Sequence, residues 1–263
     1  MKITLHKYQG TGNDFVVIDN RNGDYNSLSQ KQIKFLCDRR FGVGADGLML
    51  LNSLPGYDFE MKYYNADGSE STMCGNGGRC LVRFAEHIGI FKDTYLFMAI
   101  DGGHEACKTD NDWIKLKMKD VNELIHNRAH FILDTGSPHY VKLVDDVKLV
   151  NVLEEGSKIR NSEEYASEGI NVNFVEVQER QIFVRTYERG VENETLSCGT
   201  GVTAAALVCA HNDSGFNRVE VETPGGHLAV EFKKQADNSY QDIWLCGPAT
   251  FVFEAVIEIG IVR

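Results

Sequence analysis

The stretch "NADGSESTMCGNGGRC", residues 65–80, decides the fold when it is compared with "YERGVENETLSCGTGVTAAA", residues 187–206. Both stretches place a Cys-Gly-x-Gly motif directly before a helix-like sequence. The two motif cysteines, Cys74 and Cys198, are 198 − 74 = 124 residues apart. A thiol at the start of a helix therefore occurs twice, at a spacing that suggests an internal repeat.

Two further matches keep nearly the same spacing. Thr11-Gly12 recurs at Thr135-Gly136, which are 124 residues later, and "GGHEA" from Gly102 recurs as "GGHLA" from Gly225, 123 residues later. Three matches in one order at nearly one offset indicate a duplicated unit of roughly 120 residues. This period is too long for a solenoid, so we expect two similar domains.

Each repeat combines strand-like stretches with one helix-like stretch. Helices are expected over residues 78–89 and over residues 202–211, the second apolar nearly all round as in a buried helix. The strand-like stretches are 15–19, 47–51, 113–119, 140–144, 171–177, 219–223, 228–232 and 243–246. The pattern predicts an α+β fold of two pseudo-symmetric domains, each a β-barrel-like sheet wrapped around a central helix.

The domain boundaries follow from the repeat. Residues 1–119 form the first predicted domain, joined by a C-terminal strand at about 250–263, and residues 120–249 form the second. We expect the active site in the cleft between the two domains, because each contributes one cysteine motif.

Composition excludes several classes of protein. The chain has 263 residues, 43% of them apolar, and a net charge of −11. Such an acidic chain is a poor ligand for nucleic acid or an anionic membrane, and no apolar run approaches the roughly 18 residues of a membrane span. Seven cysteines without a CxxC pair indicate a reduced, cytoplasmic protein. We expect a small-molecule partner, and a homodimer is possible.

The chemistry of the two motifs points to proton transfer. The unpaired N–H groups and the dipole at a helix N-terminus favour a thiolate and also bind anions such as a carboxylate. Two such thiols, one on each face of a carbon next to a carboxylate, could remove a proton from one side and return one from the other. We expect Cys74 and Cys198 to be this catalytic pair, with no metal and no cofactor. The other five cysteines are expected to be packing residues.

The chain resembles the diaminopimelate epimerase family, which interconverts LL- and meso-diaminopimelate without pyridoxal phosphate. The resemblance runs from "GTGNDFVVID" to "GPATFVFEAVIEI" and includes both cysteine stretches. It implies the diaminopimelate epimerase-like fold and a role in lysine and peptidoglycan precursor biosynthesis. Proline racemases share the duplicated fold but typically carry His where this chain has Asn76.

The resemblance also implies roles for other residues. His139 and Glu188 would tune the thiols, and Arg189 would pair with the distal carboxylate of the substrate. The full set of implied substrate-binding residues is Asn13, Asn65, Gly75, Asn76, Asn171, Glu188, Arg189, Gly199 and Thr200. Taken alone, His139 reads as a loop or core residue, Glu188-Arg189 as a surface pair and the asparagines as turn residues.

Three departures from the family pattern affect recognition of the distal group. Ser137 stands where many members have Asn, Gly47 stands where many have Gln, and "ERGVENET" is one residue longer than usual. None of the three alters the cysteine motifs.

Three other functions stay open on sequence grounds. The first is another cofactor-independent racemase or isomerase of this fold, such as a proline or hydroxyproline racemase. The second is nucleophilic thiol chemistry through a covalent intermediate, and the third is an amino-acid-binding protein. Neither the second nor the third function needs two equivalent thiols. If the two sulfurs flank one carbon, mild oxidant should inactivate the protein and reductant should restore it.

Overall fold

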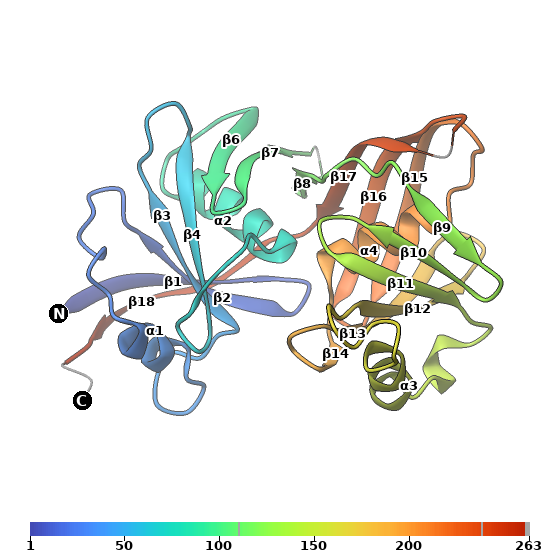
Figure 1. The fold of residues 1–263 in the computed structure, drawn as a ribbon. Helices are drawn as coiled ribbons and strands as arrows, with labels where there is room; N and C mark the ends of the chain where they lie inside the picture. Colours follow the sequence, from blue (N-terminus) through green and yellow to red (C-terminus); the bar gives the residue numbers. More distant parts are fainter. Residues whose placement is uncertain (110, 238, 261–263) are drawn as a thin grey trace. The chain divides into compact units, whose positions relative to one another are not determined.

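The computed structural model describes residues 1–109, 111–237 and 239–260, which form two compact units. Unit 1 comprises Met1–Leu116 and the segment that begins at Pro248, and unit 2 comprises Lys117–Gly247. In Figure 1 each unit consists of strands arranged around a helix.

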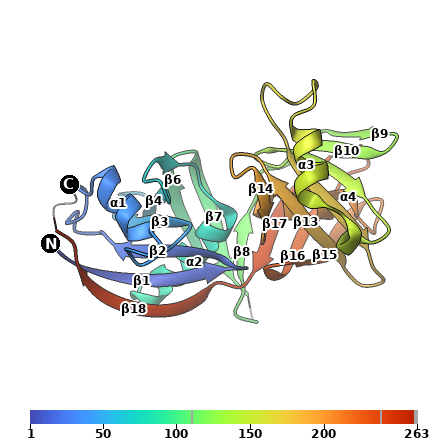
Figure 2. The same cartoon turned by 90° about the horizontal axis from the view of Figure 1, so that it is seen from below.

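Unit 1 is built on a mixed sheet. Its strands are β1 (Lys2–Gly10), β2 (Asn13–Asp19), β3 (Gly47–Asn52), β4 (Phe59–Asn65), β5 (Glu70–Ser71), β6 (Thr94–Ala99), β7 (Gly102–Lys108), β8 (Ile114–Lys117) at the unit boundary, and β18 (Thr250–Glu258). Neighbours β18, β1 and β2 are antiparallel, β2 and β3 parallel, and β3 and β4 antiparallel. Strand β4 then runs parallel to β6, which continues antiparallel into β7 and β8. Figures 1 and 2 show β18 beside β1.

Unit 2 repeats this order of pairings. Its strands are β9 (Leu124–Asn127), β10 (His130–Asp134), β11 (Pro138–Leu143), β12 (Asn171–Val177), β13 (Ile182–Glu188), β14 (Asn193–Thr195), β15 (Gly215–Thr223), β16 (Gly226–Lys234) and β17 (Tyr240–Gly247). Neighbours β9, β10 and β11 are antiparallel, β11 and β12 parallel, and β12 and β13 antiparallel. Strand β13 runs parallel to β15, which continues antiparallel into β16 and β17. The shared topology confirms the predicted pseudo-symmetric α+β fold.

The repeat extends to the register of single residues. In unit 1 Phe15 pairs with Gly47 across β2 and β3, and in unit 2 His139 pairs with Asn171 across β11 and β12. Both residues of the second pair lie 124 positions after those of the first. The turns between β6 and β7 and between β15 and β16 also match, because Gly102 and Gly226, 124 residues apart, have positive φ angles of 125° and 130°. Such angles suit glycine, which has no Cβ.

One helix lies inside each sheet, as predicted. Helix α2 (Gly75–His87) packs against β1, β2, β3 and β18. Helix α4 (Gly199–Val208) packs against β10 to β13 and β15 to β17, and its residues from Gly201 to Leu207 are buried. The burial confirms the expectation from its nearly uniform apolar sequence.

Both central helices begin three residues earlier than the sequence pattern indicated. Their N-caps are Cys74 and Cys198, which have extended backbones with φ of −101° and −113°. The glycine-rich segment that we expected as a turn is therefore the first helical turn. The helices end at His87 and Val208, two and three residues before the expected ends.

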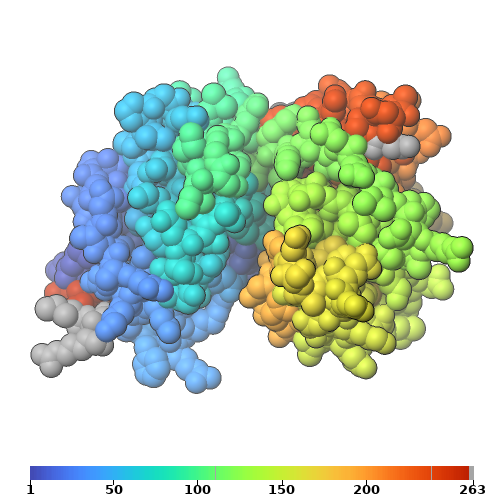
Figure 3. Space-filling view, in the orientation of Figure 1, coloured from blue at the N-terminus to red at the C-terminus, as the bar shows by residue number. Residues whose placement is uncertain are grey.

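Each unit also has a second, shorter helix that the pattern did not reveal. Helix α1 (Gln30–Cys37) begins at a capping box formed by Ser29 and Gln32 and buries three residues, Ile33, Leu36 and Cys37. Helix α3 (Val152–Arg160) follows the 3-10 turn Val147–Leu149 and lies on the surface of unit 2 in the space-filling view (Figure 3). Short helices with few buried positions give little periodicity in sequence.

The C-terminal strand was expected to run to the end of the chain. Strand β18 ends at Glu258, and residues 261–263 lie outside the described residues. Over the ranges that the structure covers, none of the helices is both long and apolar enough to cross a membrane.

Gly156 brings α3 close to β13, which gives a test of this packing. A Cβ at this position would lie 2.4 Å from Tyr187 Cβ and 2.6 Å from its Cγ. Overpacking of this kind typically costs about 1–3 kcal/mol, more than the gain of up to about 1 kcal/mol from replacing a helical glycine by alanine. We expect Gly156→Ala to lower the free energy of unfolding measured in urea.

Leu153→Ala is the matched control in the same helix. Leu153 is 51% exposed, so this change should alter the free energy of unfolding by less than about 0.5 kcal/mol. Equal effects of the two substitutions would contradict close packing of α3 on β13.

Candidate active site

Each central helix presents a cysteine at its N-terminus. Cys74 caps α2 and Cys198 caps α4, and neither side chain makes a capping hydrogen bond. Cys74 is half-buried and Cys198 is buried. The first N–H groups of an α-helix have no acceptor within the helix, so each thiol lies beside a potential anion site.

The second glycine of each motif has a packing role. A Cβ at Gly77 would lie 3.2 Å from Met49 Sδ, and a Cβ at Gly201 would lie 2.4 Å from Asn173 Oδ1. Met49 and Asn173 occupy matching positions on β3 and β12, 124 residues apart. These glycines therefore bring the first turn of each helix close to its sheet.

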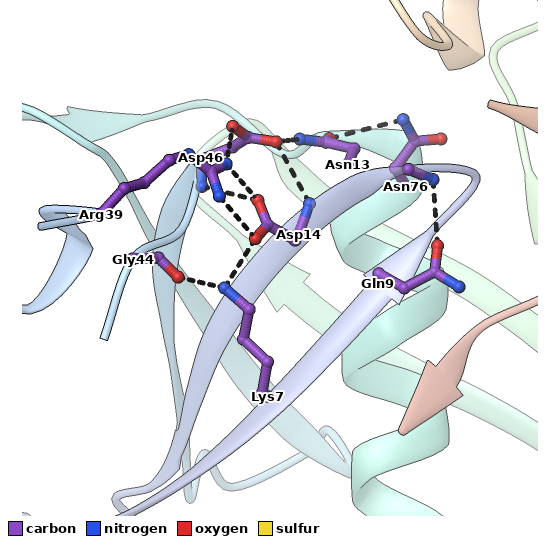
Figure 4. Close-up of polar contacts among 9 residues, drawn as sticks. Lys7, Gln9, Asn13, Asp14, Arg39, Gly44, Asp46 and Asn76 are labelled. Atoms are coloured by element: carbon purple, nitrogen blue, oxygen red, sulfur yellow. Dashed lines mark hydrogen bonds and ion pairs between the residues drawn. The ribbon is translucent and has the colours of Figure 1, made fainter. Parts of the chain in front are cut away.

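Asn13 and Asn76 lie together beside Cys74 in unit 1. The Sγ atom of Cys74 is 3.6 Å from Asn13 Oδ1, and Asn76 Nδ2 is 3.4 Å from the same oxygen. The other end of the Asn13 amide donates to Asp46 Oδ2 at 2.6 Å. Figure 4 shows this row of side chains. The structure thus brings together three of the predicted site residues, and Asp46 was not among them.

A cluster of charges holds Asp46 in place (Figure 4). Arg39 bridges Asp46 and Asp14 at 2.7 and 2.6 Å, and Lys7 pairs with Asp14 at 2.7 Å. Burial alone would raise the pKa of Asp14, but hydrogen bonds and charges from Arg39 and Lys7 outweigh it and lower the pKa to about 2. Asp14 is therefore ionised near neutral pH.

Asn65 and Gly47 face each other across β3 and β4. The Asn65 backbone closes the following turn through hydrogen bonds with Ser69 and Gly68. A Cβ at Gly47 would lie 2.4 Å from the Tyr63 ring and 2.6 Å from the backbone oxygen of Tyr64. A glutamine side chain, frequent here in the family, would therefore not fit beside Tyr63.

In unit 2, Ser137 connects two predicted substrate-binding residues. Its Oγ accepts from Asn171 Nδ2 at 2.9 Å and from the Arg189 guanidinium at 3.3 Å. The side-chain oxygen of Asn171, Oδ1, in turn accepts from the Arg189 backbone N–H at 2.9 Å. The serine that departs from the family pattern is thus part of the same cluster.

Glu188 and Thr200 are held by neighbouring hydroxyl groups. Thr195 Oγ1 donates to Glu188 Oε2 at 2.8 Å, and Thr135 Oγ1 donates to the Thr200 backbone oxygen at 2.9 Å. Thr200 Oγ1 lies 3.5 Å from Cys198 Sγ. The first turn of α4 therefore carries a hydroxyl group beside its thiol, followed by the motif glycine Gly201.

The extra residue in "ERGVENET" belongs to a well-bonded loop. Gly190 and Glu192 have positive φ angles of 89° and 56°. The Glu192 carboxylate accepts from the Gly190 N–H at 3.1 Å and from the Tyr187 hydroxyl at 3.1 Å. The longer loop is therefore anchored on β13, directly after Arg189.

His139 is completely buried on β11, inside unit 2. Its Nδ1 lies 3.1 Å from Asn173 Nδ2, which also donates to the Tyr140 oxygen, while Asn173 Oδ1 accepts from Thr186 Oγ1 at 2.9 Å. Since the amide must donate to both acceptors, His139 Nδ1 is unprotonated and Nε2 carries the proton. Burial and, secondarily, the charge of Arg189 lower the pKa of His139 to about 3. The histidine is neutral at physiological pH.

The two units differ at these buried positions. Phe15 and Met49 in unit 1 correspond to His139 and Asn173 in unit 2, each 124 residues later. Tyr63 pairs with Met49 as Thr186 pairs with Asn173. Phe15 and Met49 beneath α2 are therefore replaced by the hydrogen-bonded His139 and Asn173 beneath α4. The sequence pattern did not single out Asn173 or Thr186.

Of the cysteines outside the motifs, Cys37, Cys80 and Cys246 are buried, and Cys107 and Cys209 are half-buried. Burial raises the pKa of Cys37, Cys80 and Cys209 to about 12, so these thiols stay protonated. No cluster of three or more His, Cys, Asp or Glu side chains suited to a metal ion occurs within the described ranges.

Known proteins resemble this sequence over most of its length. The model of the diaminopimelate epimerase family matches residues 5–123 and 131–252. A protein named diaminopimelate epimerase from Flavobacterium psychrophilum is 50% identical over 96% of this chain and 99% of its own length. A protein of the same name from Aquifex aeolicus is 39% identical over 94% of this chain and 95% of its own length.

Solved structures with low sequence identity share the fold. A phenazine biosynthesis protein of the PhzF family from Bacillus anthracis is 15% identical, with a TM-score of 0.78 over 98% of this chain and all of that one. A hydroxyproline epimerase from Agrobacterium vitis, solved with trans-4-hydroxy-L-proline, is 14% identical, with a TM-score of 0.69 over 97% of this chain and 92% of that one. At these identities the likeness concerns the fold alone.

The buried polar set of unit 2 can be tested with Thr186→Val. This change keeps the shape of the side chain but removes the hydroxyl that satisfies Asn173 Oδ1. An unsatisfied buried acceptor costs about 1–3 kcal/mol, and we expect this loss in the free energy of unfolding in urea. A change below about 0.5 kcal/mol would contradict the network.

The low pKa of His139 predicts acid sensitivity with a defined sign. Below its ordinary pKa of 6.5 the unfolded chain binds a proton at His139 that the folded chain does not, so stability falls as pH falls from 6.5 towards 3. The loss approaches about 1.4 kcal/mol per pH unit. His139→Phe, which introduces the unit 1 residue, should remove this part of the slope between pH 6.5 and 5. Thr186→Val keeps the histidine and should retain it.

Proposed function

Because this chain belongs to the diaminopimelate epimerase family, we propose that it interconverts LL- and meso-diaminopimelate and that Cys74 and Cys198 are the two acid/base groups. The observation that carries the proposal is the duplicated helix N-terminus. Each unit places one cysteine at the N-cap of its central helix, in the same backbone conformation and 124 residues apart. A reaction that needs one base and one acid on opposite faces of a carbon would use two such thiols.

The proposed step balances without an oxidant or reductant. One thiolate takes the α-proton as the C–H bond breaks, and its sulfur becomes a thiol. The opposite thiol gives its proton to the carbanion from the other face, which forms the new C–H bond and leaves a thiolate. Protein groups can supply both transfers, and proton exchange of the two sulfurs with solvent restores the starting protonation states.

The helix N-termini could stabilise the carbanion. Removing an α-proton next to a carboxylate moves negative charge onto the carboxylate oxygens. Backbone N–H groups at the first turns, near Gly75-Asn76 and Gly199-Thr200, would donate to those oxygens where the charge develops. This role supports the proposal because the same element that favours a thiolate also binds the anion.

The cluster around Ser137 is suited to the distal end of the substrate. Arg189 offers a planar guanidinium for a carboxylate, and Asn171 is fixed by hydrogen bonds to Ser137 and to the Arg189 backbone. Asn13, Asn65 and Glu188 would hold the remaining polar groups, and Glu188 and His139 would influence the thiols. Substrate contact by these residues is part of the proposal.

The runner-up is a proline or hydroxyproline racemase, since a hydroxyproline epimerase shares the fold. Asn76 argues against it. This side chain is 1% exposed and is bonded to Asn13 and Arg79, whereas proline racemases typically have His at the motif position. The biosynthetic pathway, the cytoplasmic location and a homodimer stay predictions.

The experiment is solvent exchange at the α-carbon. When LL- or meso-diaminopimelate is incubated with the protein in deuterated water, we expect deuterium at the α-carbon. NMR or mass spectrometry detects its incorporation. We expect Cys74→Ser and Cys198→Ser each to lower epimerisation by at least about 100-fold, because loss of a general acid or base typically costs 10²–10⁴-fold. Exchange with proline but not diaminopimelate would refute the assignment.

Cys209→Ala is the matched control. Cys209 is the C-cap of α4, and burial keeps its thiol protonated, so its loss should leave exchange unchanged within about twofold. A covalent thiol mechanism would instead require only one of the two motif cysteines. Full activity of either motif serine variant would therefore contradict the two-thiol proposal.

A further inference from the structure

Four side chains of unit 1 form a continuous polar row that passes Cys74. The Arg79 guanidinium donates to Asn76 Oδ1 at 3.1 Å, and Asn76 Nδ2 donates to Asn13 Oδ1 at 3.4 Å. Asn13 Nδ2 donates to Asp46 Oδ2 at 2.6 Å. The row therefore begins at a cation and ends at an anion, with two amides between them.

The two end charges determine which way both amides point. A guanidinium only donates and a carboxylate only accepts. Arg79 therefore requires the oxygen of Asn76 to face it, and Asp46 requires the NH₂ group of Asn13 to face it. With these orientations the bond between the two asparagines joins the NH₂ group of Asn76 to the oxygen of Asn13. All donors in the row therefore point from Arg79 towards Asp46.

The orientation of Asn13 matters because its oxygen faces the thiol. Asn13 Oδ1 lies 3.6 Å from Cys74 Sγ. A carbonyl oxygen accepts from a protonated thiol and repels a thiolate, whereas the NH₂ end of a rotated amide would do the reverse. The helix N-terminus favours the thiolate, so the Asn13 oxygen opposes it and favours a Cys74 that holds a proton.

The Arg79 end of the row is buried, whereas the Asp46 end is exposed. Arg79 is 0% exposed and Asn76 is 1% exposed, and Arg79 also contacts the Gly75 oxygen and Thr11 Oγ1. The Asp46 side chain is 43% exposed and pairs with Arg39 at 2.7 Å. The buried guanidinium fixes Asn76, and the hydrogen bond to Asp46 orients Asn13.

Unit 2 has no equivalent row at the matching positions. The residues 124 positions after Asn13, Asp46, Asn76 and Arg79 are Ser137, Ile170, Thr200 and Thr203. The hydroxyl of Thr200, either a donor or an acceptor, lies beside Cys198 Sγ in place of a fixed carbonyl oxygen. The surroundings of the two thiols therefore differ in kind.

We propose that Asp46 and Arg79 are positioning residues that fix the Asn13 oxygen on Cys74 and thereby keep this thiol protonated as the acid of the resting pair. The catalytic part of this inference rests on the proposed function. The orientation of Asn13 and its effect on the thiol do not, and they can be measured without substrate.

The test is the pH dependence of alkylation of Cys74 by iodoacetamide, in a Cys198→Ser background, with the modified peptide identified by mass spectrometry. In Asp46→Asn the Asn13 amide can rotate and present its NH₂ group to the sulfur, and a nearby negative charge is lost. Both changes favour the thiolate. We expect the midpoint of the rate profile to move down by about one pH unit, so that alkylation at pH 7 becomes up to about tenfold faster.

Asp101→Asn controls for the loss of charge. Asp101 accepts from the N–H of Met73, the residue before Cys74, but is not part of the row. This variant should shift the midpoint by less than half as much. An equal shift, or none in Asp46→Asn, would overturn the proposal.

A double substitution separates positioning from simple electrostatics. In an Asn13→Ala background there is no amide to rotate, so adding Asp46→Asn should move the midpoint much less than it does with Asn13 present. The same additional shift in both backgrounds would show that Asp46 acts without Asn13. The urea midpoint of each variant confirms that the chain is folded when it is alkylated.

Exchange of diaminopimelate connects the row to catalysis. In the protein with Cys198 intact, Asp46→Asn should lower kcat with a smaller effect on KM. It should also shift the alkaline limb of the kcat profile, where the acid loses its proton, in the same direction as the alkylation midpoint. An altered alkylation profile in Asp46→Asn, with no exchange of diaminopimelate by the unsubstituted protein, would sink the proposed function and leave the positioning role supported. An unaltered alkylation profile would sink the positioning role alone.

Discussion

The structure depends on the close approach of a helix N-terminus to the middle of its own sheet, made twice. At Gly201 the first turn has no room for a Cβ, which would lie 2.4 Å from Asn173 Oδ1, and at Gly77 a Cβ would make a tight contact of 3.2 Å with Met49 Sδ. Both glycines lie in the first helical turn, next to the N-caps Cys198 and Cys74. A larger residue at position 201 would push α4 away from its sheet and move Cys198 with it, so packing sets the position of this thiol.

Around this shared frame the two units have diverged in what supports the helix. In unit 1 the support under the helix is apolar, with Phe15 and Met49, and the polar groups lie at the side, ending in Asp46. In unit 2 the support is polar, with the buried His139 and Asn173, and α4 carries no buried arginine where α2 has Arg79. A symmetric backbone thus holds two thiols in unlike surroundings.

The departures from the family pattern have local physical reasons. Gly47 is required because Tyr63 fills the space a side chain would need. Ser137 still bonds Asn171 and Arg189, and the longer loop after Arg189 is tied down by Glu192. Each substitution is accommodated by neighbours that are distant in sequence, which explains why the motif alone could not show its effect.

The sequence by itself determined the duplication, the α+β class, the two enclosed helices and the two cysteines, because these depend on local pattern and on a repeated offset. It did not reveal α1 and α3, whose few buried positions give weak periodicity, and it placed the central helices three residues late because glycines read as a turn. Only the tertiary structure decided which polar groups meet. Asp46, Arg79, Asn173 and Thr186 acquire their roles through hydrogen bonds between strands and helices far apart in the chain. The donor and acceptor in each of these bonds depend on neighbouring charged groups and acceptors. Because those neighbours are distant in sequence, a local sequence pattern does not reveal them.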